Sequence, residues 1–224
     1  MKNEVFNMDC IEGMKQYPDN YFELAIVDPP YGINADKAQN KAAESRIKAQ
    51  GKSKAGRGWK QYKQTEWDND IPKKNYWDEL FRVSKNQIVW GGNYMTEYLK
   101  PSMGWIFWDK GQREFSLADG ELAWSSFDKA IRVFDMSRGE ALAKNNEGGG
   151  RFHPTQKPVK LYKWQLQNYA KKGDKILDTH LGSGSSRIAA YDMGFEFIGF
   201  ELDKDYFKAS EKRFQQHIAQ LTLF

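Results

Sequence analysis

The chain has a single cysteine, Cys10, and this scarcity excludes an internal disulfide and a zinc site built on a cysteine cluster. It has no run of 18 apolar residues, and its first residues, MKNEVFNMDC, lack the apolar core of a signal peptide. Internal repeats are also absent. These absences predict a soluble protein of a reducing compartment, the cytoplasm, with neither export nor membrane insertion.

The chain is also short, which limits how many domains it can form. At 224 residues and 26.0 kDa it can bury the core of one α/β domain, so we expect a single domain over residues 1–224. The net charge of +4 is only mildly basic and says little about partners by itself.

The basic charge is concentrated in one segment. Between residues 37 and 63, nine basic residues stand against one acid, Glu44, a net of +8 that exceeds the +4 of the whole chain. Lysine and arginine displace counterions from a nucleic-acid backbone, and interleaved aromatic rings can stack on unpaired bases. The alternative is a solvated loop without a specific partner. We interpret residues 33–75 as an inserted loop whose candidate nucleic-acid contacts are Lys37, Lys41, Arg46, Lys48, Lys52, Lys54, Arg57, Trp59, Lys60 and Lys63.

Short apolar runs alternate with helix-like stretches, the pattern of a mainly parallel sheet covered on both faces. We expect strands at residues 4–8, 23–27, 86–90, 104–108, 175–178 and 195–201, while 121–127 and 130–136 could add a hairpin. We expect helices at residues 10–17, 76–85, 93–99, 159–171, 184–193 and 203–220, with Asp203 capping the last. Segments 33–75 and 137–152 show little periodicity and are expected to be loops.

The stretch KILDTHLGSGSSRIAA reads as a strand, an acid, a glycine loop and a helix. Gly182 and Gly184 allow a sharp turn close to a ligand, and the following helix points free amide groups at it. Glu201 ends the next strand 17 residues beyond Gly184, near the spacing at which a carboxylate meets ribose hydroxyls. Cofactors with a pyrophosphate, such as NAD and FAD, are bound by a G-x-G-x-x-G loop, and this chain has Arg187 where the third glycine would stand. A pyrophosphate cofactor is therefore disfavoured. S-adenosylmethionine is favoured instead, its amino group needing an acid such as Asp178.

The stretch AIVDPPYGIN ends a buried strand with an acid, two prolines and a tyrosine. Because proline has a carbonyl but no amide proton, Asp28 and Pro29 offer two acceptors in a rigid frame with few competing donors. An exocyclic amino group fits that frame, since two acceptors on its hydrogens favour a tetrahedral nitrogen that can attack a methyl sulfonium. Tyr31 could stack on the base. The structural alternative is a rigid proline turn that closes a strand.

Taken together, these residues resemble the β-class amino-methyltransferases of DNA, which comprise N6-adenine and N4-cytosine enzymes. The tetrapeptide D-P-P-Y precedes the glycine loop in the chain, which is the order of the β class. HPTQKP, residues 153 to 158, and GFELDKDYF are similar to two further blocks of the class. The resemblance implies a Rossmann-like, S-adenosylmethionine-dependent methyltransferase fold, a doubly wound mixed sheet with an antiparallel hairpin strand on the C-terminal side.

The resemblance also implies a set of site residues. Asp9 and Cys10 would lie beside the adenine of the cofactor, and the HPTQKP block would shape the methionine end. The implied catalytic residues are Asp28, Pro29, Pro30 and Tyr31. The implied residues for S-adenosylmethionine are Asp9, Cys10, Asp28, His153, Thr155, Lys157, Pro158, Asp178, His180, Leu181, Gly182, Ser183, Gly184 and Glu201. No metal site is expected.

Two features depart from the class. Where the class usually has D-P-F before the glycine loop, this chain has Asp178, Thr179 and His180, and we expect His180 to be a pocket wall rather than a base. The segment 137–152 is too short for the target-recognition domain that the class places there. We therefore expect a short recognition loop at 137–152, with the basic segment 33–75 taking part of the DNA contact.

The leading hypothesis is site-specific N6-methylation of a flipped adenine in double-stranded DNA, as in restriction-modification, in a bacterial or phage-infected cell. N4-methylation of cytosine is the alternative with nearly the same chemistry, although the acid of the tetrapeptide is more often serine there. Methylation of a protein glutamine is disfavoured, because that family prefers asparagine at Asp28 and places the cofactor loop first. A further alternative, from a different functional class, is a non-catalytic and basic nucleic-acid-binding subunit. A homodimer would suit the class, and the sequence reveals neither an interface nor a target site.

Overall fold

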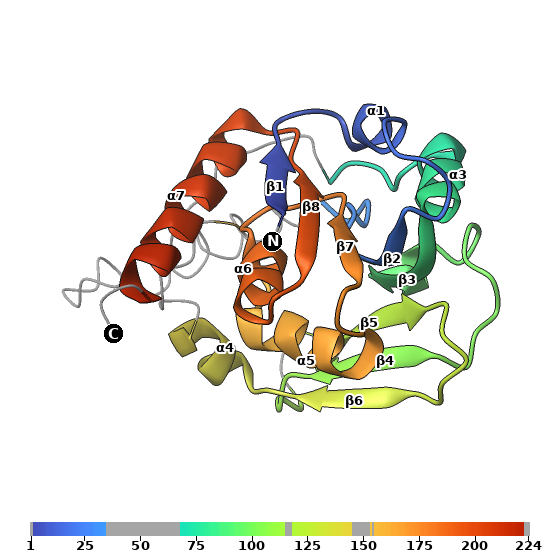
Figure 1. The fold of residues 1–224 in the computed structure, drawn as a ribbon. Helices are drawn as coiled ribbons and strands as arrows, with labels where there is room; N and C mark the ends of the chain where they lie inside the picture. The colour runs from blue at the N-terminus through green and yellow to red at the C-terminus, as the bar shows by residue number, and fades with distance from the viewer. Residues whose placement is uncertain (1, 35–67, 115–117, 145–152, 154, 222–224) are drawn as a thin grey trace.

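The computed structural model describes residues 2–34, 68–114, 118–144, 153 and 155–221 (Figure 1). The strands are β1 (Asn3–Phe6), β2 (Phe22–Val27), β3 (Ser84–Trp90), β4 (Trp105–Asp109), β5 (Gly120–Ser125), β6 (Arg132–Asp135), β7 (Lys175–Asp178) and β8 (Glu196–Phe200). The helices are α1 (Cys10–Met14), α3 (Lys74–Val83), the 3-10 turn η1 (Gly92–Tyr94), α4 (Arg138–Lys144), α5 (Val159–Tyr169), α6 (Ser185–Asp192) and α7 (Lys204–Leu221).

The eight strands form one mixed sheet in the order β1-β8-β7-β2-β3-β5-β4-β6. Neighbouring strands from β1 to β3 are parallel, and β5 runs antiparallel to both of its neighbours, β3 and β4. The expected doubly wound mixed sheet is therefore confirmed. Its antiparallel strand comes from the middle of the chain, not from the C-terminal side.

Both faces of the sheet are buried, as β2 illustrates. Leu24 and Ile26 belong to the core that includes residues of α5 and α6, whereas Ala25 and Val27 belong to the core that includes residues of α1 and α3. Successive side chains of a strand point to opposite faces, so an almost continuous apolar run fills both cores. The sheet is thus the middle layer between two sets of helices (Figure 1).

The prediction that residues 121–127 and 130–136 pair with each other as a hairpin is wrong. Both strands exist, but β5 and β6 lie on opposite sides of β4, antiparallel and parallel to it respectively. The antiparallel hairpin is formed by β4 and β5. Alternation of apolar residues predicted that these strands exist, and it carries no information about which strand lies next to which.

Two helix expectations also need correction. The helix expected at 93–99 is only the 3-10 turn η1, which follows Gly91 in the left-handed conformation with φ of 68°. The loop expected at 137–152 contains α4, whose start is capped by Ser137: its hydroxyl accepts the Glu140 amide at 3.1 Å. The Asp203 cap of α7 is confirmed, since its carboxylate accepts the backbone amides of Asp205 and Tyr206.

The parallel strands end together at one edge of the sheet. Phe6 of β1 pairs with Phe200 of β8, and Val27 of β2 pairs with Val89 of β3. The chain runs outward from β2 to β3 on one side and from β7 to β8 on the other, so the strand order reverses between β2 and β7. Ligands of doubly wound sheets bind at the carboxyl ends of the strands beside such a reversal.

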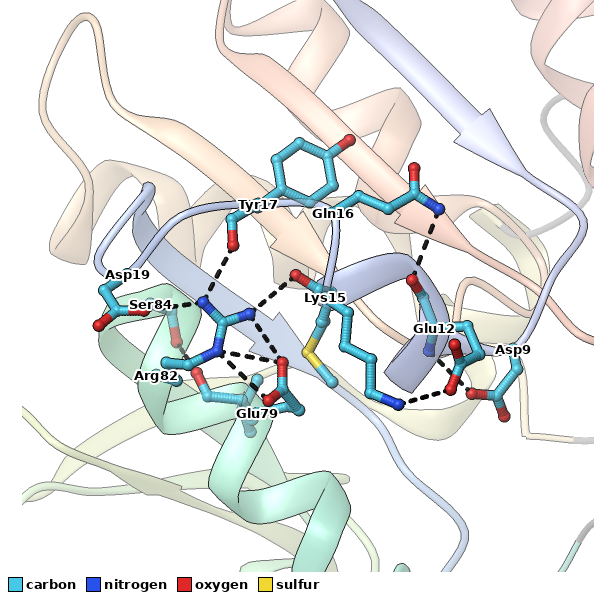
Figure 2. A network of polar contacts seen from close by, with 11 residues as sticks. Asp9, Glu12, Lys15, Gln16, Tyr17, Asp19, Glu79, Arg82 and Ser84 are labelled. Carbon is cyan, nitrogen blue, oxygen red and sulfur yellow. Dashed lines mark hydrogen bonds and ion pairs between the residues drawn. The ribbon is translucent and has the colours of Figure 1, made fainter.

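Arg82, near the end of α3, connects that helix to the segment that follows α1 (Figure 2). Its guanidinium donates to the carbonyl oxygens of Met14 at 3.2 Å and Tyr17 at 3.0 Å. It also contacts the carboxylates of Asp19 at 2.8 Å and Glu79 at 2.7 Å. Charge-assisted hydrogen bonds of this kind fix the end of α1 and the segment before β2 against α3.

Replacing Arg82 with Ala is expected to lower the free energy of unfolding by about 1–2 kcal/mol, because several charge-assisted hydrogen bonds are lost at a partly exposed site. Urea unfolding followed by circular dichroism measures the change. The control is Lys74→Ala, which removes an exposed ion pair with Asp78 at the other end of α3 and should leave the stability unchanged. Equal midpoints for the two variants would contradict the role of Arg82.

Within the described part of the chain, no helix has the length and apolarity needed to cross a membrane. The same residues contain no cluster of three or more histidine, cysteine or acidic side chains that could hold a metal ion.

Candidate active site

A cavity of about 420 Å³ lies at the carboxyl ends of β1, β2, β7 and β8. Most of the predicted cofactor residues meet there, although they come from five separate parts of the chain. The predicted residues that line it are Asp9, Cys10, Asp28, Pro30, His153, Thr155, Lys157, His180, Leu181, Gly182, Ser183 and Glu201. The cavity is also lined by residues that were not among the predicted site residues: Met8, Gln156, Tyr162, Thr179, Leu202, Asp203 and Tyr206.

Three predicted cofactor residues do not line this cavity. Pro158 precedes the first turn of α5, and Gly184 precedes α6 in the left-handed conformation with φ of 71°. Asp178 is 2% exposed and lies beneath the glycine loop. These residues shape the walls from behind and do not face the cavity.

The carboxylate of Asp178 holds the glycine loop through two donors. Ser186 donates its hydroxyl at 2.5 Å, and His180 donates its backbone amide at 3.0 Å. Burial raises the pKa of Asp178 to about 7, against the lowering effect of those two donors. The Asp178 side chain therefore ties the end of β7 to the start of α6.

The glycine loop is also fixed by Glu201 at the end of β8. One carboxylate oxygen accepts the Gly182 amide at 2.8 Å and the other accepts the Asp203 amide at 2.9 Å. Burial raises the pKa of Glu201, while these amides act in the opposite direction. Behind the loop, the buried Arg213 donates to the Ser183 carbonyl at 2.9 Å, a support that no local pattern predicted.

Asp9 and Cys10 form the start of α1 at the same edge. The carboxylate of Asp9 accepts the amides of Ile11 at 2.9 Å and Glu12 at 3.1 Å and so caps the helix (Figure 2). Burial raises the pKa of Cys10 to about 12, with the charge of Asp9 adding to the effect. The Cys10 thiol is consequently neutral and serves as part of an apolar wall.

His180 lies in this wall as a neutral imidazole. Burial lowers its pKa to about 4. Its Nδ1 lies 2.9 Å from the Thr179 hydroxyl, and its ring contacts the edge of Tyr76 with centroids 5.4 Å apart. These contacts fit the expected packing role of His180.

A second cavity of about 540 Å³ adjoins the first. Two residues, Asp28 and Thr155, line both cavities. The other residues that line the second cavity are Pro29, Tyr31, Ile33, Asp68, Gly91, Asn93, Tyr94, Phe107, Lys110, Ala118, Gly120, Glu121, Leu122 and Arg138. The predicted catalytic tetrapeptide thus divides between the two cavities, with Pro30 in the first, Pro29 and Tyr31 in the second, and Asp28 in both.

Both carboxylate oxygens of Asp28 have partners. The Tyr31 hydroxyl donates to one oxygen at 2.6 Å, and the Lys157 ammonium donates to the other at 2.6 Å. The ammonium also lies 3.1 Å from the Tyr31 oxygen. Burial raises the pKa of Asp28, and the nearby ammonium and hydroxyl groups oppose that rise.

Lys157 has a second carboxylate partner, Glu121 of β5, at 3.3 Å. Glu121 is also paired with Lys110 at 2.5 Å. Burial alone would raise the pKa of Glu121, but the two ammonium groups outweigh it and lower the pKa to about 2. The sequence predicted Lys157 as a cofactor residue and missed Glu121, which is separated from both Asp28 and Lys157 along the chain.

The ring of Tyr31 forms one side of the second cavity. It stacks on Tyr94 with ring centroids 5.3 Å apart and planes 17° apart. A side chain at Gly91 would collide with the Tyr31 ring, so glycine is required there. The backbone amides of Tyr31 and Gly32 both donate to Asp68, at 2.6 and 3.0 Å. Tyr31 is therefore held through its backbone amide and its hydroxyl, and its ring packs between Tyr94 and Gly91.

The ten predicted nucleic-acid contacts between residues 37 and 63 lie outside the described residues. Their assignment stays a prediction.

Comparison with known proteins gives one family match. The profile of a DNA methylase family, that of the N6 and N4 methyltransferases, matches residues 60–212. This range includes Glu121, Lys157, the glycine loop and Glu201, and it begins after the D-P-P-Y tetrapeptide.

Two curated relatives match at similar levels. The Type II methyltransferase M2.DpnII of Streptococcus pneumoniae is 30% identical over 146 residues, 61% of this chain and 53% of the relative. The Type II methyltransferase M2.LlaDCHI of Lactococcus lactis subsp. cremoris is 31% identical over 144 residues, 60% of this chain and 52% of the relative. The chain spans about half the length of the curated relatives it matches.

Solved structures show the same fold at low identity. A putative DNA modification methylase from Thermus thermophilus has a TM-score of 0.56 at 15% identity, covering 96% of this chain and 95% of that one. The M1.HpyAVI complex with SAM has a TM-score of 0.54 at 19% identity, covering 94% and 98%. The cytosine-N4-specific PvuII DNA methyltransferase has a TM-score of 0.57 at 14% identity, covering 96% and 86%.

Proposed function

Because the chain belongs to the DNA methylase family of N6 and N4 methyltransferases, we propose that it transfers a methyl group from S-adenosylmethionine to N6 of an adenine flipped out of double-stranded DNA. The observation that carries this proposal is the place of Asp28, which directly follows β2 and lines both cavities. The proposed reaction needs a group that contacts the base in one cavity and faces the methyl donor in the other. Asp28 lies where the two cavities meet and can do both.

The first cavity suits S-adenosylmethionine in size and in the chemistry of its lining. Its volume of about 420 Å³ falls in the range of small-molecule sites, about 300–1,000 Å³. Each oxygen of Glu201 accepts one backbone amide, which leaves each a lone pair for a ribose hydroxyl. We assign Asp9 and Cys10 to the adenine end, and His153 and Thr155 to the methionine end.

For Asp178 we propose a different role from the one expected from sequence. Its carboxylate is buried beneath the loop and engaged by the Ser186 hydroxyl and the His180 amide. We therefore assign Asp178 to holding the glycine loop and not to direct contact with the amino group of the cofactor.

The second cavity would receive the flipped base. Tyr31 offers a ring for stacking, and Asp28 and the Pro29 carbonyl offer acceptors for the two hydrogens of the amino group. S-adenosylmethionine supplies an electrophilic methyl group on its sulfonium. The amino nitrogen forms a bond to the methyl carbon as the carbon–sulfur bond breaks, with its electron pair going to sulfur, and the extra proton leaves the nitrogen for the Asp28 carboxylate. Asp28 thus orients the nucleophile and then accepts its proton.

The basic segment remains our proposal for part of the DNA contact. Its net charge of +8 over residues 37–63 supports binding to phosphates by counterion release.

Deleting residues 37–63 is expected to abolish DNA binding, because nine basic side chains are removed at once. Fluorescence anisotropy with a labelled duplex, at two salt concentrations, measures the loss. Calorimetric titration with S-adenosylmethionine is the control and should show unchanged cofactor binding. A truncated protein that binds both ligands as the wild type does would contradict this assignment.

The function itself is tested by incubating the protein with unmethylated DNA and S-adenosylmethionine, followed by base-resolution mapping of methylation. We expect N6-methyladenine at a recurrent short sequence. Methylation at N4 of cytosine would favour the alternative enzyme. A protein that neither binds the cofactor nor methylates DNA would instead be a non-catalytic nucleic-acid-binding subunit.

A further inference from the structure

The contacts of Asp28 bear directly on the proposed reaction. The amino group of a base needs acceptor capacity on Asp28, yet one carboxylate oxygen is engaged by the Tyr31 hydroxyl and the other by the Lys157 ammonium, each at 2.6 Å. A carboxylate held at this distance by an ammonium is a weaker acceptor for a third donor, because its charge is already compensated. Each Asp28 oxygen keeps a lone pair, as those of Glu201 do, and withdrawal of the ammonium when the base enters would restore the full acceptor strength of the carboxylate.

Lys157 could withdraw only if another anion received it. Its side chain is 3% exposed, and an ammonium buried to that extent without a partner is strongly unfavourable. Glu121 provides that partner, since one of its oxygens already lies 3.3 Å from the Lys157 ammonium. A small movement of the ammonium would exchange a short contact with Asp28 for a short contact with Glu121.

Glu121 is well placed to receive the ammonium. It lies on β5, on the wall of the second cavity, where the base would enter. Lys110 holds the other Glu121 oxygen at 2.5 Å and so fixes the carboxylate in position. The four charged groups form a row in which each ammonium touches at least one carboxylate, so the exchange leaves neither ammonium unpaired.

We propose that Glu121 is a positioning residue that takes the Lys157 ammonium from Asp28 when the base enters the second cavity, and thereby frees Asp28 to accept the amino group. This inference rests on the proposed function. It adds a role for β5 in a reaction whose other groups come from the tetrapeptide.

The test compares Glu121→Gln with Glu23→Gln. Glu23 lies near the start of β2, away from the carboxyl ends of the strands; it is paired with Lys85 at 3.0 Å and is 27% exposed, against 28% for Glu121. Single-turnover methyl transfer to unmethylated DNA should fall by about tenfold or more in Glu121→Gln, since the nucleophile is no longer well positioned. The dissociation constant for S-adenosylmethionine should stay within about twofold of the wild type, because Glu121 does not line the first cavity. Glu23→Gln should change neither.

The pH profile distinguishes positioning from a structural role. Asp28 is faced by Lys157, Tyr31, Glu121, Tyr162 and Asp178. Burial raises the pKa of Asp28 and Glu121 adds to that rise, so removing the Glu121 charge lowers the pKa. The acid limb of methyl transfer should therefore move to lower pH in Glu121→Gln. It should return toward the wild-type position in Glu121→Asp, which keeps the charge.

Three results would overturn the inference. The first is a Glu121→Gln rate within about twofold of Glu23→Gln, together with an unmoved acid limb, which would mean that Lys157 stays on Asp28 during the reaction. The second is equal loss of methyl transfer and cofactor affinity in Glu121→Gln, which would indicate a structural role. The third is absence of methyl transfer by the wild type, which would overturn the proposed function and this inference with it.

Discussion

Replacing Asp28 with Ala is expected to lower the rate of methyl transfer by about 10²- to 10³-fold. This is the size of effect found when one preorganised hydrogen-bonding group is removed from a reacting centre. Under the proposed mechanism, the variant would lose the acceptor that orients the amino nitrogen and the group that takes its proton. Lys157 keeps Glu121 as a partner, so the buried ammonium is not stranded. The rate is measured with labelled cofactor at saturating S-adenosylmethionine, and the affinity for the cofactor is measured in parallel.

Asp192→Ala is the matched control for this variant. Asp192 is 12% exposed and contacts Lys163 at 2.6 Å, whereas Asp28 is 16% exposed and contacts Lys157 at 2.6 Å. Both substitutions therefore remove a partly buried, ion-paired carboxylate, but Asp192 ends α6 and lines neither cavity. Full activity in Asp28→Ala, or an equal loss in both variants, would refute the assignment of Asp28.

Replacing Glu201 with Ala is expected to weaken S-adenosylmethionine binding by about 100-fold. The ribose loses its carboxylate acceptor, and one charged hydrogen bond contributes about 1.5–3 kcal/mol, which includes the roughly 2.8 kcal/mol of a 100-fold change. The amides of Gly182 and Asp203 lose the same acceptor, which loosens the glycine loop. Calorimetric titration measures the affinity. The rate at saturating cofactor should largely recover, because Glu201 does not line the cavity that would receive the base.

The control for this variant is Glu196→Ala, at the opposite end of β8 from the strand-end cavity. It should bind S-adenosylmethionine as the wild type does. If Glu201→Ala bound the cofactor within about threefold of the control, the cofactor would not occupy the first cavity as proposed. Asp28→Ala and Glu201→Ala thus separate the two cavities, one changing the rate and the other the affinity.

The strand-end residues of the site were predictable because the relevant signals are local. An apolar run followed by D-P-P-Y places Asp28 at a strand end, and a glycine loop after β7 places Gly182 beside the same edge. Parallel strands then bring these ends together whatever their separation in the chain. The fold class and most of the cavity lining follow from that rule.

The contacts that organise Asp28 were not predictable, because they join residues that are far apart in the chain. Lys157 follows Asp28 by 129 residues, and Glu121 reaches Lys157 only because β5 inserts between β3 and β4. That insertion was the part of the topology that the sequence reading misassigned. Long-range strand pairing is set by packing over the whole sheet, so a local pattern that identifies a strand does not identify its neighbour.

Mass spectrometry of nucleosides is the most direct measurement of the proposed reaction. Unmethylated duplex DNA is incubated with S-adenosylmethionine and either the wild type or Asp28→Ala, then digested and analysed. We expect N6-methyldeoxyadenosine from the wild-type reaction, at least about 100-fold less from Asp28→Ala over the same short incubation, and no N4-methyldeoxycytidine from either. N4-methyldeoxycytidine as the product, or no methylated nucleoside from a wild type that binds the cofactor, would contradict adenine methylation at this site.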